Sequence, residues 1–236
     1  MAAMVFDTDG VITDSARLHA AAWKRAFDAY LQEHPPPAAH DRRPFDARDD
    51  YLAYVDGKSR LDGARSFLVS RGSDPSQATV QEVAAVKERH FTERLRDGGV
   101  DAYPGTVRLL RALHRAGVPM AAASASRHAS ELLSGAGVRD FFADLVDGGE
   151  AARLGLAGKP DPALFREAAR RLGVPPSRTA VAEDALAGVE AGRRGGFGLV
   201  IGVNRTRTEG FGAQLLRHGA DVVVDDLADL LDDAKD

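Results

Sequence analysis

The sequence predicts an α/β protein in which a doubly wound parallel sheet carries an inserted all-helical segment. The chain opens with a short apolar run at 3–6, and further apolar runs alternate with helical segments from about residue 100 onward. The intervening residues, about 16–99, show helical periodicity only. Strands that alternate with helices form right-handed crossovers, which build a parallel sheet with helices on both faces.

Composition and charge narrow the classes of function. Of the 236 residues, 44% are apolar and 28% are charged, which is typical of soluble globular proteins. A net charge of −4 leaves no basic surplus for a nucleic-acid partner. The absence of cysteine excludes disulfides and thiolate metal sites. The N-terminal apolar run is too short for a signal peptide or a membrane span, so we expect a cytoplasmic protein without a membrane partner.

The helical insert is predicted from periodicity and from helix breakers. Apolar residues within 16–31 fall on one stripe, which indicates an amphipathic helix, and three prolines at 35–37 end it. Ser59 and Asp62 form a capping pair at the start of one later helix. The later helices are expected around 47–54, 59–71 and 78–96.

Residues 1–15 and 100–236 are therefore expected to form an α/β core, and residues 16–99 a helical domain. The joining segments near 14–17 and 96–103 would serve as a hinge. Core strands are expected at 118–123, 143–146, 179–182, 198–203 and 221–224, and core helices at about 105–116, 127–136, 161–172 and 185–194. The acidic residues 225–236 are expected to form a last helix and a solvated end.

Polar residues at the predicted strand ends carry the functional prediction, because ligands of a doubly wound sheet bind beyond the carboxyl ends of its strands. In chain order these residues, with a lysine that precedes the helix at 161–172, are Asp7, Asp9, Ser124, Lys159, Glu183 and Asp184.

The acidic residues suit phosphoryl transfer from a phosphate ester. The Asp7 carboxylate can attack phosphorus. The Asp9 carboxyl can protonate the leaving oxygen and later deprotonate the acceptor, which adds about 10²–10⁴-fold to the rate. Two acids this close need a compensating cation or a raised pKa. Glu183 and Asp184 add hard oxygen ligands that suit Mg²⁺.

Ser124 and Lys159 complete this set. Ser124 and the amides that begin its helix can bind phosphoryl oxygens, and Lys159 can oppose the charge that builds on them. Structural alternatives exist: Ser124 as a helix N-cap, Lys159 as a solvated loop residue, and the acidic pairs as turn or helix-terminus chemistry. The occurrence of four complementary motifs at different predicted strand ends favours the functional interpretation.

The motifs "FDTDGVITD", "ASASR", "GKPDP" and "AEDALAG" resemble, in order, those of the haloacid dehalogenase-like superfamily of phosphotransferases. The resemblance implies a Rossmann-like core with a mobile helical cap. It also implies a metal bound by the Asp7 side chain, the Asp9 carbonyl and Asp184, with Glu183 bound or close by. Thr8 replaces a usual bulky apolar residue. Because members that cleave haloacids lack an acid at the position of Asp9, the resemblance implies phosphate-ester substrates.

Further segments, "DGVITDSARLHAAAWK", "VDGKSRLDG" and "SASRHA", resemble the β-phosphoglucomutases. The resemblance implies that Arg60 clamps a second phosphate, that Ser126 and Arg127 hold the phosphate that is not transferred, and that Lys87 helps to place the acid/base residue. The candidate substrate-binding residues are His19, Trp23, Gly57, Arg60, Lys87, Ser126 and Arg127.

Some of these residues have structural alternatives. Lys87 shares a helical face with Ala84 and Phe91 and could extend past the apolar surface to solvent. His19 could be a satisfied core histidine, and Trp23 could belong to the core of the cap.

The resemblance implies a mutase that interconverts β-glucose 1-phosphate and glucose 6-phosphate through a phosphorylated Asp7 and a bisphosphate intermediate. The alternative is a phosphatase for a small sugar phosphate or nucleotide, because the same four motifs serve both. A signalling receiver module is disfavoured by Asp9 and by the helical insert. An inactive binding module lacks support, because no expected catalytic group is missing. We expect a monomer whose partner is a small phosphorylated sugar.

Overall fold

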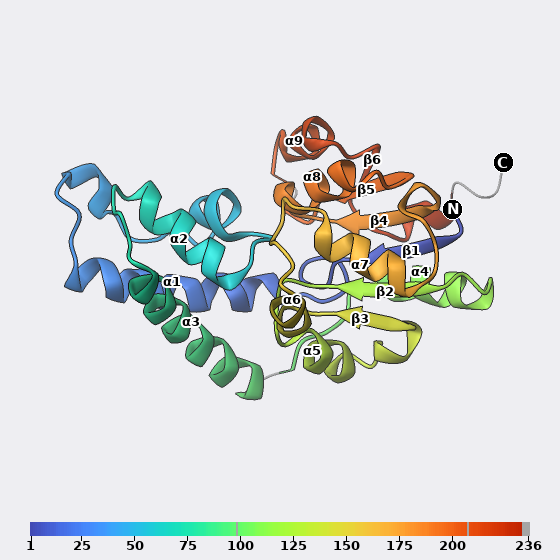
Figure 1. Ribbon diagram of the computed structural model, residues 1–236, viewed down its shortest axis with the longest axis horizontal. Coiled ribbons are helices and arrows are strands. Elements are labelled where there is room, and N and C mark those ends of the chain that lie inside the picture. The colour runs from blue at the N-terminus through green and yellow to red at the C-terminus, as the bar shows by residue number, and fades with distance from the viewer. Residues whose placement is uncertain (98, 207, 233–236) are drawn as a thin grey trace. The chain divides into compact units, whose positions relative to one another are not determined.

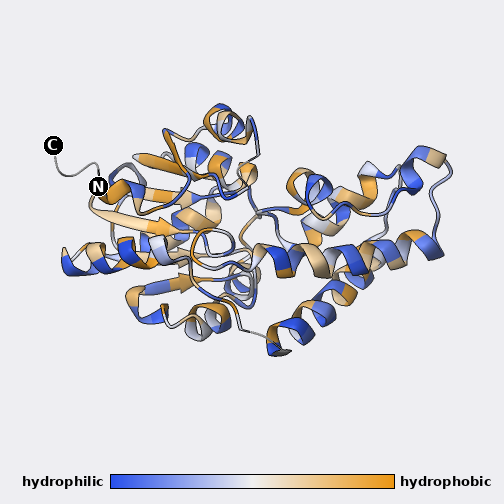
Figure 2. Cartoon of the chain, turned by 180° about the vertical axis from the view of Figure 1, so that it is seen from behind, coloured by the Kyte–Doolittle hydropathy of each residue, from blue (hydrophilic) through white to orange (hydrophobic). Residues whose placement is uncertain are grey.

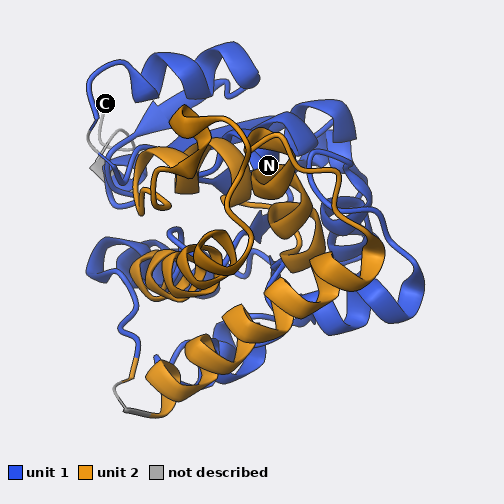
Figure 3. Cartoon of the chain, turned by 90° about the vertical axis from the view of Figure 1, so that its left-hand side faces the viewer, with its two compact units in different colours: residues 1–14, 100–236 blue, residues 15–99 orange. Residues whose placement is uncertain are grey.

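The computed structural model describes residues 1–97, 99–206 and 208–232. The chain forms two compact units (Figure 3): unit 1 comprises residues 1–14 and 100–236, and unit 2 comprises residues 15–99. The chain passes between them twice, after residue 14 and after residue 99.

Unit 1 is built on a six-stranded parallel sheet in the order β3-β2-β1-β4-β5-β6 (Figure 1). This order confirms the predicted doubly wound α/β fold, and it reverses between β1 and β4, where such sheets bind ligands. The strands are β1 (Ala3–Phe6), β2 (Met120–Ala123), β3 (Asp144–Val146), β4 (Thr179–Glu183), β5 (Leu199–Val203) and β6 (Val222–Val224).

The register of the central strands brings the predicted site residues to one edge of the sheet. Phe6 pairs with Ala122 of β2 and with Ala182 of β4. All residues of β1, β2 and β4 are buried, and these strands are largely hydrophobic in Figure 2. Continuous apolar runs are needed here because helices cover both faces of a parallel sheet.

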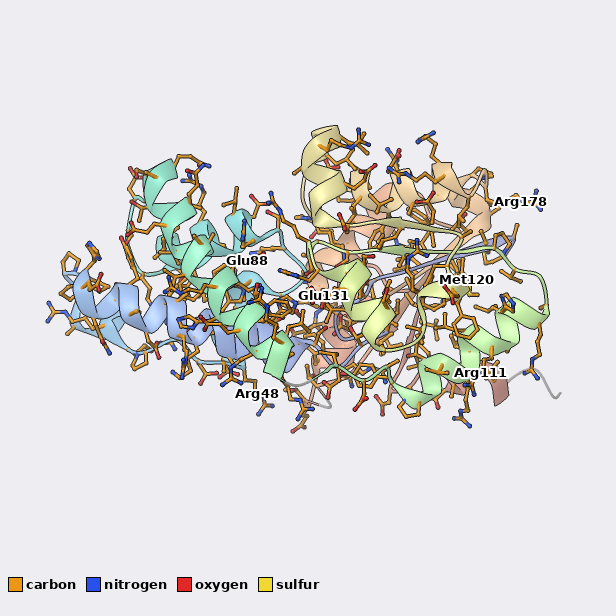
Figure 4. The ribbon with its side chains drawn as sticks, turned by 90° about the horizontal axis from the view of Figure 1, so that it is seen from below. Arg48, Glu88, Arg111, Met120, Glu131 and Arg178 are labelled. Atoms are coloured by element: carbon orange, nitrogen blue, oxygen red, sulfur yellow. The ribbon has the colours of Figure 1, made fainter. Side chains whose placement is uncertain are left out.

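Helices lie on both faces of the sheet. On one face α7 contacts β1, β2 and β3, while α8 and α9 contact β4, β5 and β6. On the other face Leu109 and Leu110 of α4 pack with Met120 (labelled in Figure 4) and Phe6. The helices of unit 1 are α4 (Pro104–Arg115), α5 (Ala129–Gly135), α6 (Gly148–Leu154), α7 (Ala163–Arg171), α8 (Leu186–Gly195), α9 (Phe211–His218) and α10 (Asp229–Asp232).

Two of these helices, α6 and α9, were not predicted. α6 has no buried residue and therefore no apolar stripe; the Asp147 carboxylate starts it by accepting from the Gly149 and Glu150 N–H groups at 2.8 and 2.9 Å. α9 is short and buries only Phe211 and Leu215. The predicted last helix is α10, and residues 233–236 of the expected solvated end lie outside the described residues.

Unit 2 is all-helical, as predicted. Its helices are α1 (Ala16–Glu33), α2 (Arg60–Ser70), α3 (Gln77–Asp97) and the short turns η1 (Ala39–Arg42) and η2 (Tyr51–Val55). Aromatic rings fill its core, with Phe27 and Phe67 centred 4.1 Å apart. The predicted capping pair is confirmed, because Ser59 Oγ accepts from the Asp62 N–H at 3.2 Å. Among the described residues, none of the helices combines the length and apolarity that crossing a bilayer requires.

A helical segment forms where one is expected at 47–54, but it covers residues 49–55 and is π-helical over Tyr51–Val55. The preceding chain is organised around polar groups. The buried Asp50 carboxylate accepts from Arg43 at 2.7 Å and from Arg71 at 2.7 Å. The N–H groups of Arg48 and Asp49 donate to the Asp46 carboxylate, which caps the start of this segment.

Candidate active site

The chain turns sharply after β1, and this turn presents both aspartates at the sheet edge. The Asp7 N–H still donates to Ala182 of β4 at 3.0 Å, so Asp7 continues the strand. Residues 8–13, which we name the nucleophile loop, then fold back: the Thr8 carbonyl accepts from the Ile12 and Thr13 N–H groups at 2.9 and 3.0 Å.

Three charged side chains from distant segments meet at the tip of β1. Lys159 Nζ donates to Asp7 Oδ1, and it lies 3.3 Å from Glu183 Oε1. Asp7, Lys159 and Glu183 are 5%, 3% and 0% exposed, respectively. The alternative of Lys159 as a solvated loop residue is therefore wrong. The ammonium lies over the Phe165 ring, 4.6 Å from its centroid, so apolar packing also holds the cation in place.

Burial and charge together set the ionisation of this cluster. Burial raises the pKa of Asp7 to about 6; the Lys159 charge opposes this shift and the Asp9 charge adds to it. Burial alone would lower the pKa of Lys159, but attraction to Asp7 and Glu183 raises it above its usual range. At neutral pH the Asp7 carboxyl is therefore largely ionised beside a charged ammonium, as an attacking carboxylate must be.

Three carboxylates form a group that can hold a cation. One oxygen each from Asp7, Glu183 and Asp184 lie within 4.8 Å of one another. Two glycines make room: a Cβ on Gly10, where φ is +80°, would lie 1.9 Å from Asp184 Oδ2, and a Cβ on Gly188 would lie 1.6 Å from Glu183 Oε1. Clustered hard oxygen donors fit Mg²⁺. The donor set therefore fits the expected metal.

Asp9 and Ser124 contact each other at the same edge. Ser124 Oγ donates to Asp9 Oδ2 at 3.2 Å and accepts from the Ser126 N–H at 3.1 Å. Helix α5 begins only at Ala129. Because Ser124 lies well before the helix, the alternative of Ser124 as its N-cap is wrong.

The candidates Ser126 and Arg127 follow Ser124 in the segment between β2 and α5. The Ser126 hydroxyl accepts from the His128 N–H at 3.2 Å. The Arg127 side chain is exposed. The assignment of both residues to substrate binding stays a prediction.

A buried polar pair lies within unit 2. Lys87 Nζ lies 3.0 Å from His19 Nδ1, and the two residues are 4% and 8% exposed. The His19 ring stacks on Phe91 at 4.1 Å, and the ammonium lies 4.4 Å from the centroid of the same ring. Lys87 is therefore buried rather than extended past the apolar surface to solvent.

The remaining candidates of unit 2 lie in different settings. Trp23 packs in the core of the unit, and its ring stacks on Phe27 with centroids 4.7 Å apart. This agrees with the alternative that Trp23 belongs to the core of the helical domain. Arg60 begins α2 and pairs with Glu88 of α3, labelled in Figure 4, at 3.0 Å. Gly57 lies in the turn before α2 with φ of +68°.

One contact to the nucleophile loop was missed. Arg205 follows β5, and its Nε donates to the Gly10 carbonyl at 3.0 Å. The residue, though not its contact, could have been selected, because Asn204 and Arg205 directly follow the apolar run 198–203. The rule that selected the other strand-end residues also applies to this strand.

Comparison with known proteins agrees with this arrangement. Residues 1–196 match the haloacid dehalogenase-like hydrolases. A β-phosphoglucomutase of Mycobacterium tuberculosis is 46% identical over 238 residues, which cover 97% of this chain and 91% of the relative. The crystal structure of a β-phosphoglucomutase from Clostridium difficile has a TM-score of 0.74 at 25% identity, covering 98% of this chain and 93% of that one.

A CbbY variant from Rhodobacter sphaeroides, solved with xylulose 1,5-bisphosphate, has a TM-score of 0.73 at 26% identity and covers 98% of this chain and 96% of that one. The matched family, the overall identity and the shared fold agree with the motifs at the strand ends. The chain therefore belongs to the haloacid dehalogenase-like superfamily, in its β-phosphoglucomutase-like branch, and is an enzyme of the phosphomutase or phosphatase type.

Proposed function

We propose that the protein is a Mg²⁺-dependent β-phosphoglucomutase that interconverts β-glucose 1-phosphate and glucose 6-phosphate. The observation that carries the proposal is the 46% identity with a mycobacterial β-phosphoglucomutase along nearly the whole chain. In this proposal unit 1 is the catalytic core and unit 2 is the cap. That the protein is a cytoplasmic monomer stays a prediction.

Each charged group of unit 1 has a role in this chemistry. An Asp7 oxygen forms a bond to phosphorus while the bond from phosphorus to the ester oxygen breaks, and Asp9 gives that oxygen a proton. Lys159 opposes the charge on the transferring group, and Ser124 orients the Asp9 carboxyl.

Four groups would hold the metal, and enzymes of this family generally use Mg²⁺. They are the Asp7, Glu183 and Asp184 carboxylates and, from the resemblance to the superfamily, the Asp9 carbonyl. When bound, the ion would supply positive charge that offsets the negative charge of the Asp7 carboxylate and the phosphoryl group.

A mutase needs a second phosphate site, because its sugar bisphosphate intermediate must be held at both ends. From the resemblance we propose Arg60 in unit 2, and separately Ser126 and Arg127 in unit 1, as residues that bind substrate phosphate, since the arginine fork suits phosphate oxygens. The CbbY variant solved with a sugar bisphosphate supports a substrate of this class.

Phosphorus NMR tests the proposal. The protein is supplied with Mg²⁺, β-glucose 1-phosphate and a trace of β-glucose 1,6-bisphosphate. A mutase converts the signal of the 1-phosphate into that of glucose 6-phosphate. Release of inorganic phosphate instead would support the phosphatase alternative, which the shared catalytic groups and a structural neighbour described as a hydrolase (TM-score 0.81) also permit.

Arg60→Ala is expected to lower mutase activity by roughly tenfold or more, while hydrolysis of 4-nitrophenyl phosphate changes little, because that ester has no second phosphate. Arg65→Ala is the matched control: Arg65 lies on the same helix but donates to Pro75 and Gln77 at 3.2 and 3.0 Å. Equal losses on the two reactions in Arg60→Ala would argue against a dedicated second site.

Added Mg²⁺ is expected to raise the melting temperature of the protein. A ligand at 100 times its dissociation constant stabilises the folded state by about 2.7 kcal/mol, which is a shift of several degrees for a chain of this size. Asp184→Asn removes one charged oxygen donor and should abolish most of the shift. A shift of unchanged size in that variant would place the ion elsewhere.

A further inference from the structure

Arg205 makes an unusually dense set of contacts for a loop residue. Its side chain is only 13% exposed. Its Nε donates to the Gly10 carbonyl at 3.0 Å, and its Nη2 donates to the Val11 carbonyl at 3.3 Å and to Thr106 Oγ1 at 3.1 Å. Its Nη1 donates at 3.3 Å to the Asp226 carboxylate. One guanidinium thus joins the segment after β5 to the nucleophile loop and to α4.

The same guanidinium also supports the far end of the nucleophile loop. It stacks on the Tyr103 ring, 3.9 Å from the ring centroid. The Tyr103 N–H donates to the Ile12 carbonyl at 2.9 Å, and the Tyr103 hydroxyl donates to Asp14 at 3.0 Å. The loop is therefore held directly through two carbonyls and indirectly through Tyr103.

The nucleophile loop needs these donors. Its Thr8 carbonyl is satisfied from within the loop. The Gly10 and Val11 carbonyls accept instead from Arg205, and Val11 also accepts from Thr106 at 2.8 Å. Both residues are buried. A buried acceptor that loses its donor costs about 1–3 kcal/mol, which a short loop relieves by moving.

Any such movement is transmitted to Asp9, because Gly10 is the next residue in the chain. Beyond its backbone, the Asp9 carboxyl is oriented by Ser124 at 3.2 Å. A misplacement of about 1 Å in a reacting group can cost about 10²-fold in rate. The planar fork of arginine donates to the two carbonyls from two separate nitrogens in a fixed geometry, which the single ammonium nitrogen of a lysine does not reproduce.

We propose that Arg205 is a positioning residue for Asp9: it fixes the Gly10 and Val11 carbonyls so that the Asp9 carboxyl stays aligned with the leaving-group oxygen. The inference rests on the proposed acid role of Asp9. Arg205 acts through the loop backbone and not through contact with the substrate.

The test compares two aryl esters of similar shape in single-turnover kinetics. Phenyl phosphate has a poor leaving group that needs protonation, whereas 4-nitrophenyl phosphate has a good leaving group that leaves without an acid. Arg205→Met is expected to slow phenol release by about 10- to 100-fold and nitrophenol release by less than about threefold. A merely structural role would slow both equally.

Arg166→Met is the matched control, because Arg166 also donates to two backbone carbonyls, those of Gly195 and Arg194, at 3.1 and 3.4 Å. It should leave the ratio of the two rates unchanged. If Arg205→Met does not fold, Arg205→Lys decides, and the same selective loss is expected at smaller size.

Equal losses of rate on both esters, or no loss of rate, in a folded Arg205 variant would overturn this inference but leave the proposed function intact. A wild-type protein that releases neither phenol from phenyl phosphate nor nitrophenol from 4-nitrophenyl phosphate would instead refute the phosphoryl-transfer function, and this inference with it. The two failures are therefore distinguishable.

Discussion

Asp7→Asn is expected to lower kcat on phosphate esters by roughly 10⁴-fold or more, because an amide oxygen is a poor nucleophile for phosphorus. The change keeps the size of the side chain and its acceptor oxygen toward Lys159. Lys159 also keeps Glu183 at 3.3 Å as its counter-charge. We therefore expect a folded protein, and the loss should appear in kcat when rates are measured over a range of substrate concentration.

Asp161→Asn is the control for this substitution. Asp161 lies two residues after Lys159, and its carboxylate accepts from the Ala163 N–H at 2.9 Å. It is therefore near the charged cluster in the chain but is not one of the residues that we assign to catalysis. The mass of the Asp7→Asn protein must be checked, because deamidation would restore the aspartate. Retention of more than a few per cent of wild-type activity in protein of the correct mass would refute Asp7 as the nucleophile.

Asp9→Ala is expected to separate the two halves of the reaction. An activated donor such as 4-nitrophenyl phosphate should still phosphorylate Asp7, because nitrophenolate leaves without a proton. The following step needs Asp9 to deprotonate the acceptor, so steady-state turnover should fall by about 10²–10⁴-fold. The measurable result is one equivalent of nitrophenol per enzyme, followed by very slow release.

Turnover of Asp9→Ala at the wild-type rate would remove Asp9 from the acid/base role. The absence of the first equivalent would also contradict the assignment, because it would make Asp9 necessary for attack itself. Ser124→Ala gives a useful comparison: it removes the 3.2 Å contact to Asp9 but keeps the acid, so we expect a smaller loss of turnover.

The sequence was sufficient to predict the sheet and the clustering of charged side chains at the ends of its strands, because both follow from a general property of parallel sheets. The carboxyl ends of all strands meet at one edge, so residues that follow apolar runs become neighbours whatever their separation in the chain. Asp7 and Glu183 follow the apolar runs 3–6 and 179–182, and the structure brings their carboxylate oxygens within 4.8 Å of each other. Complementary charge at several strand ends was therefore an adequate signal.

Features that depend on packing could not be predicted in this way. Helix α6 has no buried residue and so no periodic pattern. The pairing of Arg60 with Glu88 at 3.0 Å depends on how α2 and α3 pack, which periodicity does not specify. The contact of Arg205 with Gly10 requires the rotamer of one side chain. The choice between mutase and phosphatase was also beyond the motifs, because both reactions use the same core residues.

The central claim is that Asp7 accepts the phosphoryl group, and trapping that group tests it most directly. The protein is mixed with Mg²⁺ and 4-nitrophenyl phosphate, quenched in acid and reduced with borohydride, which converts an aspartyl phosphate to homoserine. Mass spectrometry of the N-terminal peptide should then show homoserine at position 7, with none in the Asp7→Asn protein. Turnover in which the reduced residue is found at another position, or in which no reduced residue is found, would contradict the account.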